Sequence, residues 1–260
     1  MVVIFDKLKT LGIGYMADPG LYTEKQPALV MIHGAGGCAQ VWQNQIHFLN
    51  HSLNPLALDL PGHGKTDGQG LTSLEEYTHW LAKVIRTLFR EPVFLMGHSM
   101  GGAIVQDMAL MYPNLLSGII LAGTGPILKV APVFLEGLKT GFEETINTII
   151  SYAYAKGTDI SIINEGAKLM KQAGSSVVQK DFEACDRFDR RKDIVKINLP
   201  CLILCGDQDR LTPPSLSKSL SKSIKKSVLE IFPSTGHMVM IESHKAFNQR
   251  IRDFVLETPR

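Results

Sequence analysis

The chain has 260 residues, of which 45% are hydrophobic and 20% are charged, so it can bury a core of ordinary size within one domain. Its 27 basic and 25 acidic residues give a formal net charge of +2, and no long run of lysine and arginine marks a surface for nucleic acid or an anionic membrane. No segment approaches the roughly 18 consecutive apolar residues that a membrane span requires. We therefore expect neither a nucleic-acid partner nor a membrane span.

The first residues and the cysteines favour a cytoplasmic protein. The N-terminus, which begins Met1-Val2-Val3-Ile4-Phe5-Asp6, lacks the basic, apolar and small-residue segments of a secretion signal, and we predict a β-hairpin over residues 2–17. Of the four cysteines, Cys201 and Cys205 lie in one predicted strand, too far apart for a disulfide. We interpret them as core thiols, which fits a reducing compartment. The sequence leaves the oligomeric state open.

Short apolar runs alternate with amphipathic stretches along the rest of the chain, which is typical of a parallel sheet covered by helices on both faces. The predicted strands are residues 28–33, 55–60, 93–97, 118–122, 201–205 and 228–232. The predicted helices are residues 39–50, 72–90, 101–112, 213–222 and 242–257. Functional groups gather at the carboxyl ends of the strands in such a sheet, so the residues that follow each strand are the candidates for chemistry.

Residues 127–193 interrupt this alternation. They show apolar residues at helical spacing, such as Ile146, Ile149 and Ile150, and no convincing strand. A span of this length is too long for a loop within a compact domain. We predict that it forms a helical cap, inserted into a core made of residues 1–126 and 194–260.

The most informative motif is Gly97-His98-Ser99-Met100-Gly101, which lies between a predicted strand and a predicted helix. In this setting G-x-S-x-G is a nucleophile elbow, a tight turn that lifts the serine oxygen clear of the sheet. The glycines let the strand and the helix approach each other, and the helix N-terminus favours developing negative charge. We therefore predict that Ser99 is a nucleophile.

A serine nucleophile needs a general base, and the base needs a third group to orient it. Among the eight histidines, His237 follows the last predicted strand, which is where this topology places the base. Asp207 and Asp209 both follow the strand at 201–205 and compete for the orienting role, and we favour Asp209.

The developing oxyanion needs two backbone N–H donors. Met100 follows the nucleophile and supplies the first, and we choose Ala35 in the loop His33-Gly34-Ala35-Gly36-Gly37 for the second. The glycine spacing of this loop matches neither nucleotide-binding pattern, and no histidines or cysteines show metal-ligand spacing. We therefore expect no cofactor and no metal.

Taken in order, these motifs resemble the α/β-hydrolase superfamily from about residue 28 to the end of the chain. The motifs lie at residues 33–37, 42–45, 59–64, 97–102, 206–209 and 236–237. The resemblance implies an α/β fold with a mostly parallel central sheet flanked by helices and an inserted helical cap. It implies Ser99, Asp209 and His237 as a catalytic triad. It also implies Ala35 and Met100 as the donors of the oxyanion hole.

The residue at the elbow separates branches of the superfamily. Relatives that cleave carbon–halogen bonds or epoxides carry aspartate there, so Ser99 favours acyl transfer. We predict a serine carboxylesterase that takes small-molecule esters with neutral, apolar acyl groups, because the cap offers apolar residues while its lysines are scattered as on a solvated surface. The alternatives are an enol-lactonase, a cofactor-free perhydrolase, a hydrolase of carbon–carbon bonds and, from a different class, a hydrolase-like receptor for a small ligand.

Overall fold

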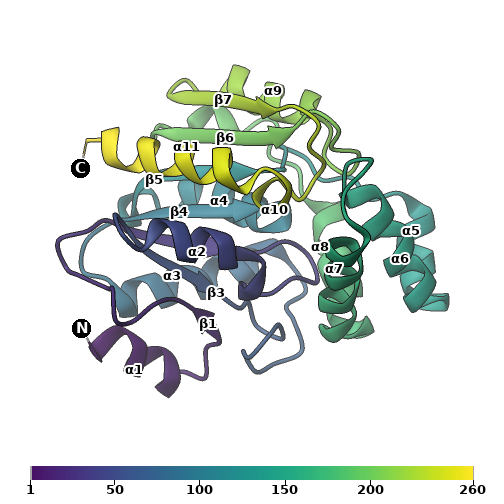
Figure 1. The fold of residues 1–260 in the computed structure, drawn as a ribbon, viewed down its shortest axis with the longest axis horizontal. Coiled ribbons are helices and arrows are strands. Elements are labelled where there is room, and N and C mark those ends of the chain that lie inside the picture. The colour runs from purple at the N-terminus through teal and green to yellow at the C-terminus, as the bar shows by residue number, and fades with distance from the viewer. Residues whose placement is uncertain (1, 260) are drawn as a thin grey trace.

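A computed structural model describes residues 2–259 of the chain and contains a seven-stranded sheet in the order β1-β3-β2-β4-β5-β6-β7 (Figure 1). Only β1 is antiparallel to its neighbour, while every other pair of strands is parallel. The strands are β1 Tyr15–Met16, β2 Ala28–Ile32, β3 Asn54–Leu58, β4 Val93–His98, β5 Leu116–Ala122, β6 Cys201–Gly206 and β7 Ser227–Phe232. The predicted parallel strands are therefore confirmed, each to within two residues.

Helices cover both faces of the sheet, because alternate strand residues point to opposite sides. In β2, Val30 and Ile32 join one apolar cluster, while Leu29 and Met31 join another. The first layer contains α1 Val2–Thr10, α3 Leu74–Leu88, α4 Met100–Met111 and α9 Pro214–Ser223. The second layer contains η1 Ala39–Trp42, α2 Gln43–Leu49, α10 Val239–Glu242 and α11 His244–Glu257. Short 3-10 turns at Pro113–Leu115 (η2) and Ile194–Lys196 (η3) precede β5 and β6.

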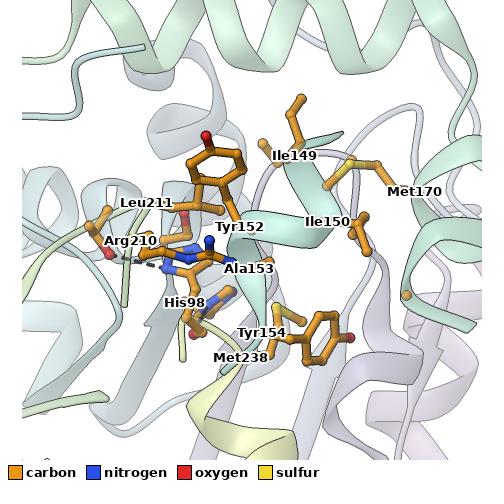
Figure 2. A pocket seen from close by; sticks show the side chains of 18 of the residues that line it. His98, Ile149, Ile150, Tyr152, Ala153, Tyr154, Met170, Arg210, Leu211 and Met238 are labelled. Atoms are coloured by element: carbon orange, nitrogen blue, oxygen red, sulfur yellow. Dashed lines mark hydrogen bonds between the residues drawn. The ribbon is translucent and has the colours of Figure 1, made fainter. Parts of the chain in front are cut away.

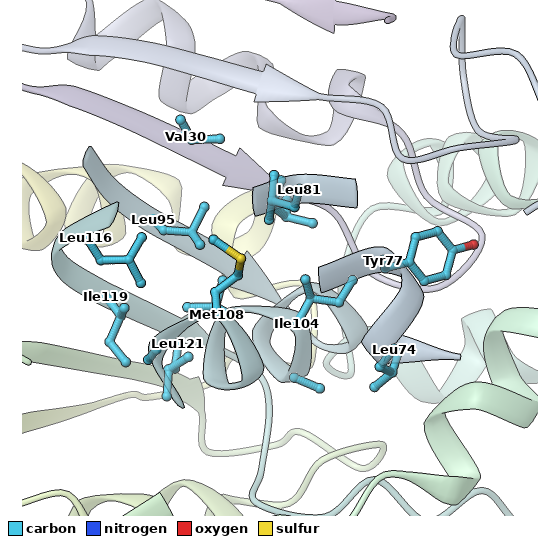
Figure 3. Packing of buried hydrophobic residues seen from close by; sticks show 14 of the residues in the cluster. Val30, Leu74, Tyr77, Leu81, Leu95, Ile104, Met108, Leu116, Ile119 and Leu121 are labelled. Carbon is cyan, nitrogen blue, oxygen red and sulfur yellow. The ribbon is translucent and has the colours of Figure 1, made fainter. Parts of the chain in front are cut away.

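The cluster between α3, α4 and the sheet shows how the first layer is held (Figure 3). Leu81 of α3 and Ile104 and Met108 of α4 pack with Val30 and Leu95, and all five side chains are fully buried. Burying side chains of this size stabilises the fold by about 1.5–3 kcal/mol each. This packing fixes α4 against β4, so the residue between them has a defined position.

The predicted hairpin over residues 2–17 is wrong. Residues 2–10 form α1, and only Tyr15 and Met16 enter the sheet, as an antiparallel edge strand beside β3. The β-branched residues near the start favour a strand, but Phe5 and Leu8 lie three positions apart and are both buried against the core. Packing of this helical face outweighs the local preference for a strand.

Four helices lie between β5 and β6, beyond the carboxyl ends of the parallel strands (Figure 1). They are α5 Pro132–Thr140, α6 Phe142–Ala153, α7 Ile160–Gln172 and α8 Ser175–Arg187. We call residues 127–193 the α5–α8 segment. It has an apolar cluster of its own, which includes Leu138, Ile146 and Val178, and its ends meet in a β-bridge between Ile127 and Asp189. Within residues 2–259, no helix has the length and apolar composition that crossing a bilayer requires.

Candidate active site

Ser99 lies between β4 and α4 with a strained backbone conformation. Its φ is +53° and its ψ is −115°, a region that residues with side chains rarely adopt. Hydrogen bonds hold this conformation: Ser99 N donates to Ala122 O at 3.0 Å, and Thr124 Oγ1 donates to Ser99 O at 2.9 Å. The strain is the one that a nucleophile elbow requires.

The glycines around Ser99 allow β4 and α4 to touch. A Cβ on Gly97 would overlap the backbone of Gly101 and lie 2.6 Å from Gly102 N. A Cβ on Gly101 would lie 2.6 Å from His33 O. Both positions therefore exclude any side chain.

Replacing Gly97 with alanine is expected to destabilise the protein by about 1–3 kcal/mol and to displace Ser99, because the new methyl group meets backbone that cannot move aside. The free energy of unfolding in urea measures the effect. Gly141→Ala is the control, since the nearest atoms to its Cβ lie at 4.0 Å and its φ is −150°. Equal stability of the two variants would contradict the predicted close contact.

His237 and Asp209 form a buried pair after β7 and β6. His237 Nδ1 lies 2.8 Å from Asp209 Oδ2, and the side chains are 5% and 0% exposed. The other carboxylate oxygen accepts hydrogen bonds from the backbone N–H groups of Leu211 and Thr212, at 2.9 and 2.8 Å. Burial alone would raise the pKa of Asp209, but the charge and hydrogen bond of His237 and the Thr212 donors outweigh it and lower the pKa.

Asp207, the other candidate for the acid, lies elsewhere. Its carboxylate accepts a hydrogen bond from Thr235 N at 3.2 Å and is exposed. The structure therefore brings Asp209, and not Asp207, to His237.

Ser99 and His237 both line one cavity of about 1290 Å³. The ring centroids of His98 and His237 are 4.5 Å apart, and His98 Nε2 donates to His237 O at 3.0 Å, which ties the end of β4 to the loop after β7. Burial and the nearby His237 lower the pKa of His98 to about 3, so His98 stays neutral and acts as a packing residue. No hydrogen bond among residues 2–259 joins Ser99 Oγ to the His237 ring. Such contacts are often long until substrate binds.

The loop after β2 forms a tight turn against Ser99. Gly37 N donates to Gly34 O at 3.0 Å, and Gly36 has a φ of +63°. A Cβ on Gly34 would lie 3.2 Å from Ser99 Cβ. The Ala35 N–H has no acceptor in this turn, and the Met100 N–H has none in α4, because the first N–H groups of a helix lack partners within it. Met100 directly follows Ser99, and Ala35 lines the same cavity as Ser99.

Residues 29–250 match the alpha/beta hydrolase family. The chain belongs to this family. It is 26% identical to the (E)-2-((N-methylformamido)methylene)succinate hydrolase of Acinetobacter baylyi, over 89% of this chain and 91% of that protein. It is 25% identical to the pimeloyl-[acyl-carrier protein] methyl ester esterase of Pectobacterium carotovorum, over 87% of this chain and 93% of that protein.

Solved structures agree with the sequence comparison. A thermophilic esterase superposes with a TM-score of 0.81 and 29% identity, covering 95% of this chain and 98% of that chain. The predicted α/β-hydrolase fold is therefore confirmed, and the chain is a hydrolase of this family.

The cavity of this hydrolase is lined by more apolar than polar surface, and only a few of its lining residues are charged. Figure 2 shows Ile149, Ile150, Met170 and Met238 among the side chains that line it. The charged lining residues are Lys129, Glu144, Glu165 and Arg210. Within residues 2–259, no group of three or more His, Cys, Asp or Glu side chains is arranged to hold a metal ion.

Arg210, the residue after the buried acid, connects the core to the α5–α8 segment. Its guanidinium group donates to Ser151 O and lies 4.7 Å from the centre of the Tyr152 ring (Figure 2). Arg210 is exposed and lines the cavity.

Sequence reasoning missed two residues of the site. Thr212 donates its hydroxyl to Asp209 Oδ2 at 2.8 Å, and its position three residues after the aspartate is a signal of a local side-chain turn. Asp181 of α8 is fully buried, although the sequence places it only within the predicted helical cap of residues 127–193. The sequence signal that could have revealed the burial of Asp181 is its position on the apolar face of α8, between Val178 and Ala184.

His63 forms a buried ion pair with Asp181. Its Nε2 lies 2.8 Å from the carboxylate and its Nδ1 lies 3.1 Å from Pro61 O, so both ring nitrogens face acceptors and the doubly protonated ring satisfies both. Burial would lower the pKa of His63, but the hydrogen bond and the charge of Asp181 outweigh it and raise the pKa. The groups that face this pair are His33, Asp59 and Tyr77.

We expect the His63–Asp181 pair to stabilise the fold most at low pH. Because the folded-state pKa of His63 lies above the unfolded value of about 6.5, its contribution is complete below that pH and is lost as the pH rises through the folded-state value. The difference in free energy of unfolding between wild type and His63→Gln, measured in urea from acid to alkaline pH, should shrink with rising pH. A difference that grows with pH would contradict the charged pair.

Proposed function

We propose that this hydrolase is a serine carboxylesterase that forms an acyl-enzyme on Ser99. The observation that supports it most strongly is the 2.8 Å contact between His237 Nδ1 and Asp209 Oδ2, in a cavity that Ser99 also lines. A base oriented by a buried carboxylate, beside a strained serine, is the arrangement that activates a hydroxyl at neutral pH.

In the proposed reaction, His237 takes the proton of Ser99 as its oxygen attacks the ester carbonyl. Asp209 holds the imidazole in the tautomer that accepts this proton and stabilises the imidazolium that forms. The N–H groups of Ala35 and Met100 donate to the oxyanion of the tetrahedral intermediate. His237 then protonates the departing alcohol, and water releases the acid by the same steps in reverse order.

The lining of the cavity supports an apolar acyl group as the substrate. Ile149, Ile150 and Met170 come from α6 and α7, so the α5–α8 segment supplies much of the apolar wall. We infer that residues 127–193 act as a cap over a catalytic core formed by residues 1–126 and 194–260. Esterases among the relatives and solved structures agree with an ester substrate.

A substrate that carries a carboxylate is the second candidate. Arg210 lines the cavity and forms no ion pair with a carboxylate among residues 2–259. A guanidinium group in this position suits a carboxylate ligand. One relative of this chain is named as a hydrolase of (E)-2-((N-methylformamido)methylene)succinate, a compound with two carboxylates.

A series of p-nitrophenyl esters from acetate to laurate, extended by a half-ester of a dicarboxylic acid, tests the proposal. We expect turnover that peaks at one acyl length, because the apolar cavity has a limited volume. Faster turnover of the half-ester than of the neutral ester of equal length would favour the second candidate. If no ester is hydrolysed at any length, the carboxylesterase proposal fails, and lactone hydrolysis, carbon–carbon cleavage or ligand sensing takes its place.

A further inference from the structure

One carboxylate joins the α5–α8 segment to three parts of the core. Asp181 of α8 is fully buried and accepts hydrogen bonds from Gly36 N at 2.9 Å, His63 Nε2 at 2.8 Å and Tyr77 OH at 2.9 Å. Gly36 belongs to the turn beside Ser99, His63 to the loop after β3, and Tyr77 to α3. A buried carboxylate is costly unless donors surround it, and here they do.

The same turn is in direct contact with the α5–α8 segment. A Cβ on Gly36 would lie 2.9 Å from Met170 Cγ and 3.0 Å from Val178 Cγ2, so α7 and α8 pack on the bare backbone of Gly36. Two interactions therefore hold the turn. One is the packing of α7 and α8 on Gly36, and the other is the hydrogen bond within the turn from Gly37 N to Gly34 O.

The hydrogen bond from Gly36 N fixes the central peptide of this turn. The peptide between Ala35 and Gly36 is the one that can rotate in a four-residue turn without breaking the closing hydrogen bond. With Gly36 N tied to Asp181 Oδ2, rotation would turn the Ala35 carbonyl toward a carboxylate. The Ala35 N–H lies in the neighbouring Gly34–Ala35 peptide, whose carbonyl accepts the closing hydrogen bond from Gly37 N. The closing hydrogen bond and the Asp181 hydrogen bond together hold the two peptides on either side of Ala35 in one orientation.

We propose that Asp181 is a positioning residue that holds the 34–37 turn, and hence the Ala35 N–H, in the geometry that receives the oxyanion while α8 stays docked on the core. This inference rests on the proposed function, because it assigns Ala35 to the oxyanion hole. Asp181 touches no reacting atom and acts through the turn alone.

The test compares Asp181→Ala with Asp186→Ala. Asp186 is a matched control, because it lies on the same helix and its carboxylate also accepts a backbone hydrogen bond, from Val130 N at 3.2 Å, away from the turn. We expect Asp181→Ala to lower kcat on the best ester by at least about tenfold, with KM within about twofold of wild type. A displaced N–H donor stabilises the transition state less well, while it has little effect on the binding of the substrate. We also expect faster hydrogen–deuterium exchange over residues 33–37. Asp186→Ala should change neither quantity.

Asp181→Asn should recover part of the lost kcat, because its amide oxygen can still accept from Gly36 N. Equal kcat for Asp181→Ala and Asp186→Ala, or unchanged exchange over residues 33–37, would overturn the proposal. If wild type hydrolyses no ester, the proposed function fails by itself, and the exchange comparison still decides whether Asp181 holds the turn. If Asp181→Ala does not fold, Tyr77→Phe is the second variant, because it removes one of the three hydrogen bonds to Asp181. We expect Tyr77→Phe to lower kcat as well, and an unchanged kcat for Tyr77→Phe would overturn the proposal.

Discussion

Ser99→Ala is expected to lower kcat for ester hydrolysis by about 10⁶-fold, the scale on which a serine triad loses activity without its nucleophile. The fold should persist, because alanine keeps the Cβ and the backbone hydrogen bonds to Ala122 and Thr124 that hold the strained turn. Rates on the best p-nitrophenyl ester and thermal unfolding, measured on wild type and variant in parallel, separate the two effects.

Ser215→Ala is the matched control for this substitution. Ser215 lines the same cavity, but it is exposed and lies on α9. Its kcat should stay within about twofold of wild type, as for a surface substitution outside the reacting groups. Wild-type turnover by a pure Ser99→Ala preparation would show that another group carries the reaction.

The fold could be predicted from the sequence because each parallel strand carries its own signal. Runs such as Leu29–Ile32 and Leu202–Cys205 are buried on both faces, so they read as continuous apolar stretches. The first helix could not be predicted in this way. Its β-branched residues favour a strand, and only its packing through Phe5 and Leu8 reveals a helix.

Of the candidate site, only the residues that directly follow parallel strands could be predicted from their order in the chain. Ser99, Asp209 and His237 each follow a parallel strand, so the sheet brings their loops to one edge. Asp207 and Asp209 follow the same strand, and local sequence cannot say which carboxylate turns toward His237. The role of Asp181 is harder still to predict from sequence, because the residues to which it is hydrogen-bonded lie more than 100 positions away in the chain.

The second large effect is expected for Asp209→Asn, which should lower kcat on the order of 10⁴-fold, as in serine triads that lose their orienting carboxylate. The amide oxygen of the introduced asparagine would stay with the Leu211 and Thr212 N–H groups, so its NH₂ group would face His237 Nδ1. This contact favours the tautomer of His237 that cannot accept the Ser99 proton. Steady-state rates on the best ester measure the loss.

Asp207→Asn supplies the comparison that decides between the two aspartates. Its side chain accepts one hydrogen bond, from Thr235 N at 3.2 Å, and the amide oxygen of asparagine can accept the same bond. We therefore expect kcat within about twofold of wild type, as for other exposed substitutions. A loss for Asp207→Asn as large as that for Asp209→Asn would mean that the 2.8 Å contact with His237 does not identify the acid. A loss confined to Asp209→Asn would place the charge that orients the base on the buried carboxylate, where four hydrogen bonds already hold it in the ionised form.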